Sequence, residues 1–309
     1  MADRDETIET CEDFETKILT ILPDQYQDTY ESVQPVSMGS APVKFDSNGK
    51  IAWDQMWGSF CDLAMAGGPP HKGTLLEPGV EANILALPER YEAVTDEICR
   101  GIGLVTGLSA AVSSYPGWIG VECTSTGQAG WLARAITMEN ISIGLEGMML
   151  YLPAGPYYRL KEIKNVVTVM AKTCHYWFGH TSLEQRRSIT RLFEKLETSS
   201  PLIRPIFPRD EMAPVMQEAV YGGLTASVHA TTGLRCYLRG QSDWLGLKVH
   251  DLKLAIWLMR ALVVGNVLAR REDDVVFAAV NPITDPCGEA LAERIRIAYR
   301  HGVARNIFG

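Results

Sequence analysis

The stretch Trp131-Leu132-Ala133-Arg134-Ala135-Ile136 returns 126 residues later as Trp257-Leu258-Met259-Arg260-Ala261-Leu262. Shorter matches recur at the same spacing: Trp118-Ile119-Gly120 returns as Trp244-Leu245-Gly246, and Thr106-Gly107-Leu108 returns as Thr232-Gly233-Leu234. Similar segments at one fixed period indicate an internal repeat. The sequence therefore predicts a tandem duplication, in which packing residues recur and functional residues occur in one copy only.

Each repeat is predicted to contain the elements α-β-α-β-β-α, which implies an α+β fold with helices on one face of a sheet. We expect two such units to pack with pseudo-twofold symmetry. In the first repeat, Ser125 is the expected N-cap of the central helix, and Asn140 is the expected left-handed residue at its end. Asp251 and Asn266 take these places in the second repeat.

The chain divides into four parts by composition. Residues 1–88 are read as an N-terminal extension, 89–178 as repeat one, 179–211 as a charged and then Pro- and Ser-rich linker, and 212–309 as repeat two. Within the extension we expect a helix over 8–22, a hairpin over 43–53 and a helix from Asp54 to Leu63. A loop rich in Gly and Pro follows at 66–78.

Composition excludes several classes of protein. The 309 residues are 46% hydrophobic and 21% charged, which is typical of a globular protein, and the net charge is -8. An acidic chain argues against nucleic acid and anionic membranes as partners, because both require clustered positive charge. The seven cysteines show no C-x-x-C spacing, and the N-terminus is acidic, so we expect a cytoplasmic protein with reduced thiols. A symmetric dimer is the default expectation.

One face of the predicted helix at 159–178 carries cationic and hydroxyl groups. Spacings of three and four residues place these side chains on that face: Lys161, Lys164, Thr168, Lys172 and His175. Lys164, Thr168 and Lys172 are predicted to bind a carboxylate or phosphate, and His175 is predicted to transfer a proton. The alternative is a solvated lysine face. If the groups bind a ligand, Lys172→Ala should weaken binding and leave folding intact.

The loop at 67–74 is the second candidate region. Its glycines allow the backbone to approach a ligand closely, while His71, Lys72 and Thr74 supply an acid/base group, a cation and a hydroxyl. His71 is therefore predicted to be catalytic, and Lys72 and Thr74 to bind substrate. The loop matches neither a P-loop nor a dinucleotide-binding fingerprint. The alternative is a structured turn.

Further polar residues stand out against the repeat. Glu122 ends a strand and is predicted to be the acid/base partner of His71 or His175. Arg134 is either part of an anion clamp with Arg260 or an arginine that snorkels to the surface and pairs with a carboxylate such as Glu146 or Glu272. Arg270 and Arg271 are expected to point across the interface between the repeats. No histidine or cysteine spacing demands a metal, and the sequence specifies no cofactor.

These features predict a cytosolic enzyme that acts on a small anionic metabolite in a cleft between the repeats, by general acid/base chemistry. The reaction class stays open, because motifs for hydride transfer, nucleotide hydrolysis and hydrolase triads are missing. One alternative is a tetrapyrrole, cobalamin-pathway or metal-handling protein. Chelatases of those pathways can be tandem duplications of similar length, but their N-terminal strand followed by His-Gly-Ser does not occur here. The other alternative is a non-catalytic binding or assembly protein.

Overall fold

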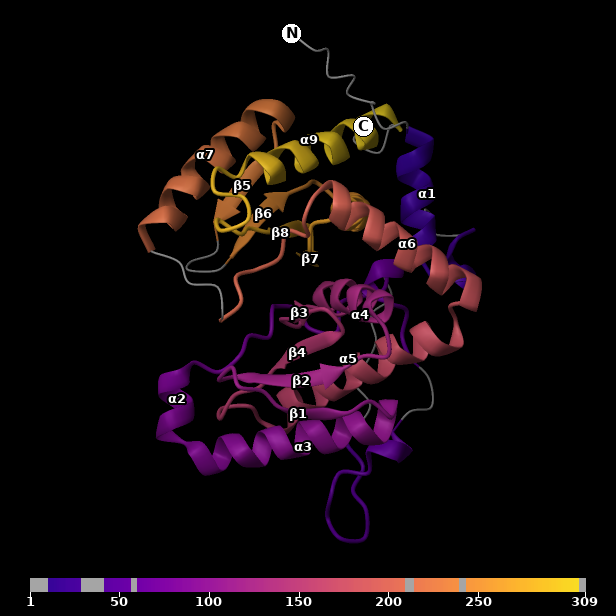
Figure 1. Cartoon of the computed structure of the whole chain (residues 1–309), viewed down its shortest axis with the longest axis vertical. Helices are drawn as coiled ribbons and strands as arrows, with labels where there is room; N and C mark the ends of the chain where they lie inside the picture. The colour runs from indigo at the N-terminus through magenta and orange to yellow at the C-terminus, as the bar shows by residue number, and fades with distance from the viewer. Residues whose placement is uncertain (1–10, 29–41, 57–59, 209–213, 239–242, 306–309) are drawn as a thin grey trace.

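The computed structural model describes residues 11–28, 42–56, 60–208, 214–238 and 243–305. These residues form a mixed α+β fold that contains two four-stranded antiparallel sheets (Figure 1). We call the sheet β1–β4 with helices α3–α5 the first lobe, and the sheet β5–β8 with helices α7–α9 the second lobe.

The sheet of the first lobe has the strand order β1-β2-β4-β3. The elements of this lobe, in chain order, are α3 (Pro88–Thr106), β1 (Ala110–Val112), β2 (Trp118–Glu122), α4 (Thr126–Met138), β3 (Gly144–Glu146), β4 (Met149–Pro153) and α5 (Leu160–Gly179). Helices α1 (Cys11–Ile21) and α2 (Glu81–Ala86) precede α3, and α6 (Leu183–Ser199) follows α5.

The sheet of the second lobe has the equivalent order, β5-β6-β8-β7. Its elements are α7 (Pro214–Thr232), β5 (Arg235–Leu238), β6 (Trp244–Lys248), α8 (Leu252–Val264), β7 (Ala269–Glu272), β8 (Val275–Ala279) and α9 (Glu289–Ala304). The predicted caps are present, since Ser125 accepts from the Gln128 amide and Asp251 accepts from the Leu254 amide. Asn140 and Asn266 both adopt a left-handed φ of 62°.

The predicted order α-β-α-β-β-α was wrong by one strand in each lobe. A further strand precedes the predicted one, β1 in the first lobe and β5 in the second, so each lobe reads α-β-β-α-β-β-α. Strand β1 is only three residues long and mostly small side chains, so its alternation is too short to recognise. Its pairing with β2, in which Ala110 lies opposite Val121, forms the edge of the sheet.

Residues 179–211 were expected to be a linker, but helix α6 occupies 17 of them. Ser182 caps its N-terminus by accepting from the Gln185 amide. Ile189, Phe193 and Leu196 bury one side of the helix at spacings of four and three. The many charged residues lie on the remaining sides, which explains why composition alone suggested a linker.

The extension follows the prediction in part. The described portion of the first helix is α1, and Ile8 lies outside the described residues. A bridge between Phe45 and Ile51 closes the predicted hairpin. The predicted helix after Asp54 does not form over its described part, because Trp53–Gln55 is a single 3₁₀ turn and Phe60–Leu63 is not helical. Trp57, which the same prediction includes, lies outside the described residues.

One hydrophobic core extends through both lobes and includes the recurring tryptophans Trp131 and Trp257. One short parallel bridge holds a segment from outside each sheet against that lobe. Leu76 pairs with Ile141 beside Asn140, and Ile203 pairs with Val267 beside Asn266. The side chains of both asparagines are buried and hydrogen-bonded. No helix in the described parts of the chain has the length and apolar character needed to cross a membrane.

We predict that Asn140→Ala lowers the free energy of unfolding by about 3 kcal/mol, because it adds left-handed strain and removes buried hydrogen bonds. The side chain donates to the carbonyls of Lys72 and Arg271, both at 2.8 Å, and accepts from Arg270 at 3.2 Å. Urea denaturation checks this. Asn140→Gly is the control: it tolerates the left-handed φ and should be about 1 kcal/mol less harmful than alanine. Equal stability of Asn140→Ala and the unmodified protein would contradict the assignment.

Candidate functional site

The predicted ligand residue Lys172 forms a buried ion pair with Glu139. Both side chains are inaccessible to solvent, and Lys172 Nζ lies 2.7 Å from Glu139 Oε1. Lys172 also contacts Cys61 Sγ at 3.4 Å and the carbonyl of Asp62 at 3.2 Å. Burial by itself lowers the pKa of the Lys172 ammonium, but Glu139 and Cys61 outweigh burial, and the net pKa is raised. Lys172 therefore stays charged, with its donors directed at the protein.

Glu139 connects the end of α4 to residues 64–71, which include the first part of the Gly/Pro-rich loop. Its two carboxylate oxygens accept from the backbone amides of Ala64 (2.9 Å) and His71 (2.8 Å). The second lobe binds the same segment from the other side: Arg260 donates to the carbonyl of Met65 (2.6 Å), and Arg271 donates to that of Gly68 (2.9 Å). This segment thus lies between the lobes and bonds to both. The sequence had predicted a ligand in a cleft at this position between the repeats.

Gly68 shows why this segment needs glycine. A Cβ atom there would lie 2.2 Å from the carbonyl oxygen of Asp62, which is a backbone clash. The preceding Gly67 has a left-handed φ of 106°. The glycines were expected to allow close approach of a ligand, whereas at Gly68 the close approach is to the backbone of Asp62, earlier in the chain.

His71 lies among lysines from both predicted regions. Burial lowers the pKa of the His71 imidazole to about 4; the negative charge of Glu139 opposes this shift, and Lys172, Lys164 and Lys72 reinforce it. Burial also lowers the pKa of the Lys164 ammonium. The structure therefore brings the predicted loop and the predicted helix face together, and it holds His71 neutral near pH 7.

Thr168 and the other predicted residues occupy distinct surroundings. Thr168 is 8% exposed, and its hydroxyl has no hydrogen-bond partner within the described part of the chain. Thr74 and Glu122 are exposed, and the Glu122 amide donates to the carbonyl of Ser109 at the end of β2. His175 is exposed near the end of α5, where its Nε2 lies 3.0 Å from His180 Nε2.

Arg134 reaches across the lobes. It is 3% exposed, donates to Asn266 Oδ1 (2.5 Å) and lies 3.9 Å from the ring centre of Phe193. Burial lowers the pKa of its guanidinium to about 10, against the opposing charge of Glu197. The guanidinium is buried rather than directed to the surface, and within the described residues it bonds to neither of the two carboxylates expected from the sequence. Glu146 instead accepts from Tyr151, and Glu272 accepts from Arg270.

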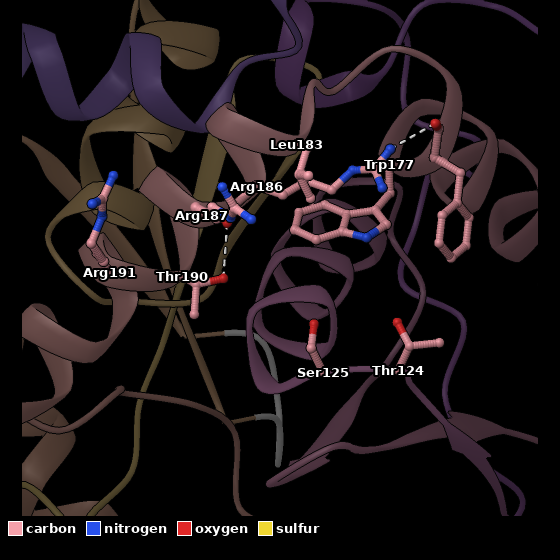
Figure 2. Close-up of a pocket in the computed structure, with 9 residues that line it drawn as sticks. Thr124, Ser125, Trp177, Leu183, Arg186, Arg187, Thr190 and Arg191 are labelled. Atoms are coloured by element: carbon pink, nitrogen blue, oxygen red, sulfur yellow. Dashed lines mark hydrogen bonds between the residues drawn. The ribbon is translucent and has the colours of Figure 1, made fainter.

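A pocket of about 520 Å³ lies at the N-terminus of α4, between α6 and the end of α5 (Figure 2). Its lining groups into three arginines, three hydroxyl residues and three apolar residues: Arg186, Arg187, Arg191, Thr124, Ser125, Thr190, Trp177, Phe178 and Leu183. We call it the arginine pocket. It lies beside the first lobe, away from the segment between the lobes.

The floor of the arginine pocket depends on a close contact between α4 and α6. A Cβ atom on Gly127 would lie 1.9 Å from Thr190 Oγ1, so glycine lets the two helices meet. Ser125 caps α4 and leaves the positive end of its dipole at the pocket. Gln128 in the same turn is fully buried, and its Nε2 has no hydrogen-bond partner within the described residues.

The two outer arginines are available to a ligand. Arg187 is exposed and makes no hydrogen bond or ion pair with the described residues, and Arg191 contacts Ser188 Oγ at a long 3.3 Å. Sequence reasoning missed both because 179–211 was interpreted as a linker. The available signal was the four-residue spacing of Arg187 and Arg191, which places two cations on one face of a helix.

Within the described residues, no group of three or more His, Cys, Asp or Glu side chains is arranged to hold a metal ion. Comparison of the chain with protein-family models, with curated proteins and with solved structures finds no match.

We predict that Lys172→Ala destabilises the fold by about 3–5 kcal/mol, because it leaves the Glu139 carboxylate buried without its cation. The double variant Lys172→Met with Glu139→Gln removes both charges and should be about 1–3 kcal/mol more stable than the single variant. Urea denaturation of the three proteins measures this. If Lys172→Ala unfolded like the unmodified protein and lost only ligand affinity, Lys172 would be a binding residue, as the sequence suggested.

We predict that His71 makes stability dependent on acid pH. Because folding lowers its pKa from about 6.5 to about 4, the unfolded chain binds the proton more tightly. Stability is complete above pH 6.5 and falls as the pH drops towards 4, by up to about 3 kcal/mol. His71→Gln should remove this part of the pH dependence. The exposed His229→Gln is the control, and an identical pH profile for His71→Gln and the unmodified protein would contradict the prediction.

Proposed function

We propose that this protein binds a small anionic ligand, a carboxylate or a phosphate, in the arginine pocket. The observation that carries the proposal is the pairing of Arg187 and Arg191 with the N-terminal turn of α4 across one cavity. First-turn amides and guanidinium groups are both strong donors to anionic oxygens. The Ser125 hydroxyl adds a further donor, whereas the Thr190 hydroxyl already donates to the carbonyl of Arg186 at 2.8 Å.

The local charge supports this proposal in spite of the acidic chain. The net charge is -8, yet the pocket lining contains three arginines and no carboxylate. Both outer arginines are exposed, so screening by salt should weaken their contribution. We therefore expect affinity that falls as ionic strength rises.

We also propose that the two lobes arose by duplication and that the binding site belongs to one copy. Support comes from the equal strand orders of the sheets and from the matching φ angles of Asn140 and Asn266. The N-cap differs between the copies. Ser125 is neutral, whereas Asp251 places a carboxylate at the start of α8, where it would repel an anion.

Acid/base chemistry on the ligand is the second candidate function. This function is favoured by the position of His71 near Lys164 and Lys72. The buried hydroxyl of Thr168 also favours it. A neutral imidazole can accept a proton, and a bound anion would raise its pKa towards the working range. For this second function, the anion would bind beside Lys164 rather than in the arginine pocket.

Titration with inorganic phosphate at low ionic strength separates the two sites. We predict that Arg187→Ala with Arg191→Ala weakens phosphate binding at least about tenfold and leaves stability unchanged. The control double variant, Lys195→Ala with Lys253→Ala, removes the same charge from exposed helix positions outside the pocket. Isothermal titration calorimetry gives the affinities.

The outcome assigns the site. Equal losses in the pocket variant and its control would mean that net charge alone governs binding, which contradicts the proposal. Loss of binding in Lys164→Met, with full binding in the pocket variant, would place the anion beside His71 and favour the second candidate.

A further inference from the structure

We infer that the ligand of the arginine pocket is a phosphate monoester that carries a planar aromatic group. This inference rests on the proposed anion binding and goes on to specify the chemistry of both ends of the ligand. The pocket lining contains both kinds of group: cationic and hydroxyl side chains, and aromatic rings beside the guanidinium of Arg186.

The cationic part offers more donors than a carboxylate needs. Arg187 and Arg191 each carry a fork of N–H donors, and Ser125 carries a hydroxyl. The hydroxyls of Thr124 and Thr190 already donate to Gln128 Oε1 and to the carbonyl of Arg186. In the first turn of α4, the Gln128 amide donates to Ser125 Oγ, and the amides of Thr126 and Gly127 precede it at the helix N-terminus. A carboxylate has two oxygens to receive these donors, whereas a phosphate monoester has three terminal oxygens in a tetrahedral arrangement and carries up to two negative charges.

Arg186 supplies the planar surface. Its Nε donates to the carbonyl of Thr181 at 3.0 Å, and one terminal nitrogen donates to the carbonyl of Phe178 at 2.7 Å. These bonds fix the guanidinium over two rings, 5.7 Å from the ring centre of Trp177 and 5.6 Å from that of Phe178. A fixed guanidinium plane beside aromatic rings favours a flat, π-bearing ligand.

Two exposed apolar side chains continue this surface. Phe178 is 44% exposed and Leu183 is 61% exposed, and both line the pocket with Arg186. Figure 2 shows Leu183 beside Arg186. The volume of about 520 Å³ lies within the range of small-molecule sites, about 300–1,000 Å³, and exceeds the space that one phosphate group fills. The remaining volume therefore accommodates an organic group against Arg186, Phe178 and Leu183.

The test is calorimetric titration of the full chain with phenyl phosphate, cyclohexyl phosphate and inorganic phosphate. The cyclohexyl ester matches the phenyl ester in charge and approximate size but is not planar. We expect phenyl phosphate to bind about tenfold more tightly than inorganic phosphate, and cyclohexyl phosphate to gain much less. Equal affinities for phenyl phosphate and inorganic phosphate, or for the two esters, would overturn the inference.

A double variant locates the aromatic group. Phe178→Ala with Leu183→Ala should reduce the phenyl phosphate affinity towards that of inorganic phosphate and leave inorganic phosphate binding unchanged. The matched control is Phe45→Ala with Leu85→Ala, which removes exposed apolar side chains elsewhere. If all three probes fail to bind, the proposed anion binding itself is wrong. If inorganic phosphate binds and the phenyl ester gains nothing, only the present inference fails.

Discussion

The buried carboxylate of Glu139 is the constraint on which the arrangement around the first lobe depends. A carboxylate with 0% exposure needs an ion pair and hydrogen bonds to replace water. Lys172 Nζ supplies the ion pair, and the amides of Ala64 and His71 supply the hydrogen bonds. These three bonds join α4, α5 and the N-terminal extension. Arg260 and Arg271 then attach the second lobe to the same segment. Gly265 ends α8 at the position that Glu139 occupies at the end of α4, so the second lobe has no carboxylate there to hold a segment in this way.

Local chemistry made part of the fold predictable. Ser125 and Asp251 were recognisable as N-caps, and Asn140 and Asn266 as left-handed residues, because each depends on the side chain and its immediate neighbours. Strand β1 was missed because three residues carry too little pattern. The predicted helix after Asp54 gave way to contacts with Glu139 and Lys172, which lie far along the chain. Local propensity does not contain such contacts.

In the candidate site too, local features were predictable and long-range contacts were not. The spacing of Lys164, Thr168 and Lys172 correctly gave one helix face, and the loop with His71 does lie against that face. The spacing could not reveal that the extension covers Lys172 completely, since burial depends on what packs against a face. The arginine pocket was harder still to predict. It forms only where α4, α5 and α6 meet, and its helix α6 had been interpreted as a linker. The three-dimensional arrangement therefore separates the buried ion pair of Lys172 and Glu139 from the exposed arginines of the arginine pocket.

We propose that an anion binds between α6 and the N-terminus of α4. The most direct measurement is anomalous diffraction from crystals soaked in sodium arsenate, a phosphate mimic whose arsenic atom can be located without reference to the surrounding density. We predict an arsenic peak within hydrogen-bonding reach of the guanidinium groups of Arg187 and Arg191 and of the first turn of α4. An arsenic peak beside His71 and Lys164, with none in the arginine pocket, would contradict the account and transfer the site to the segment between the lobes.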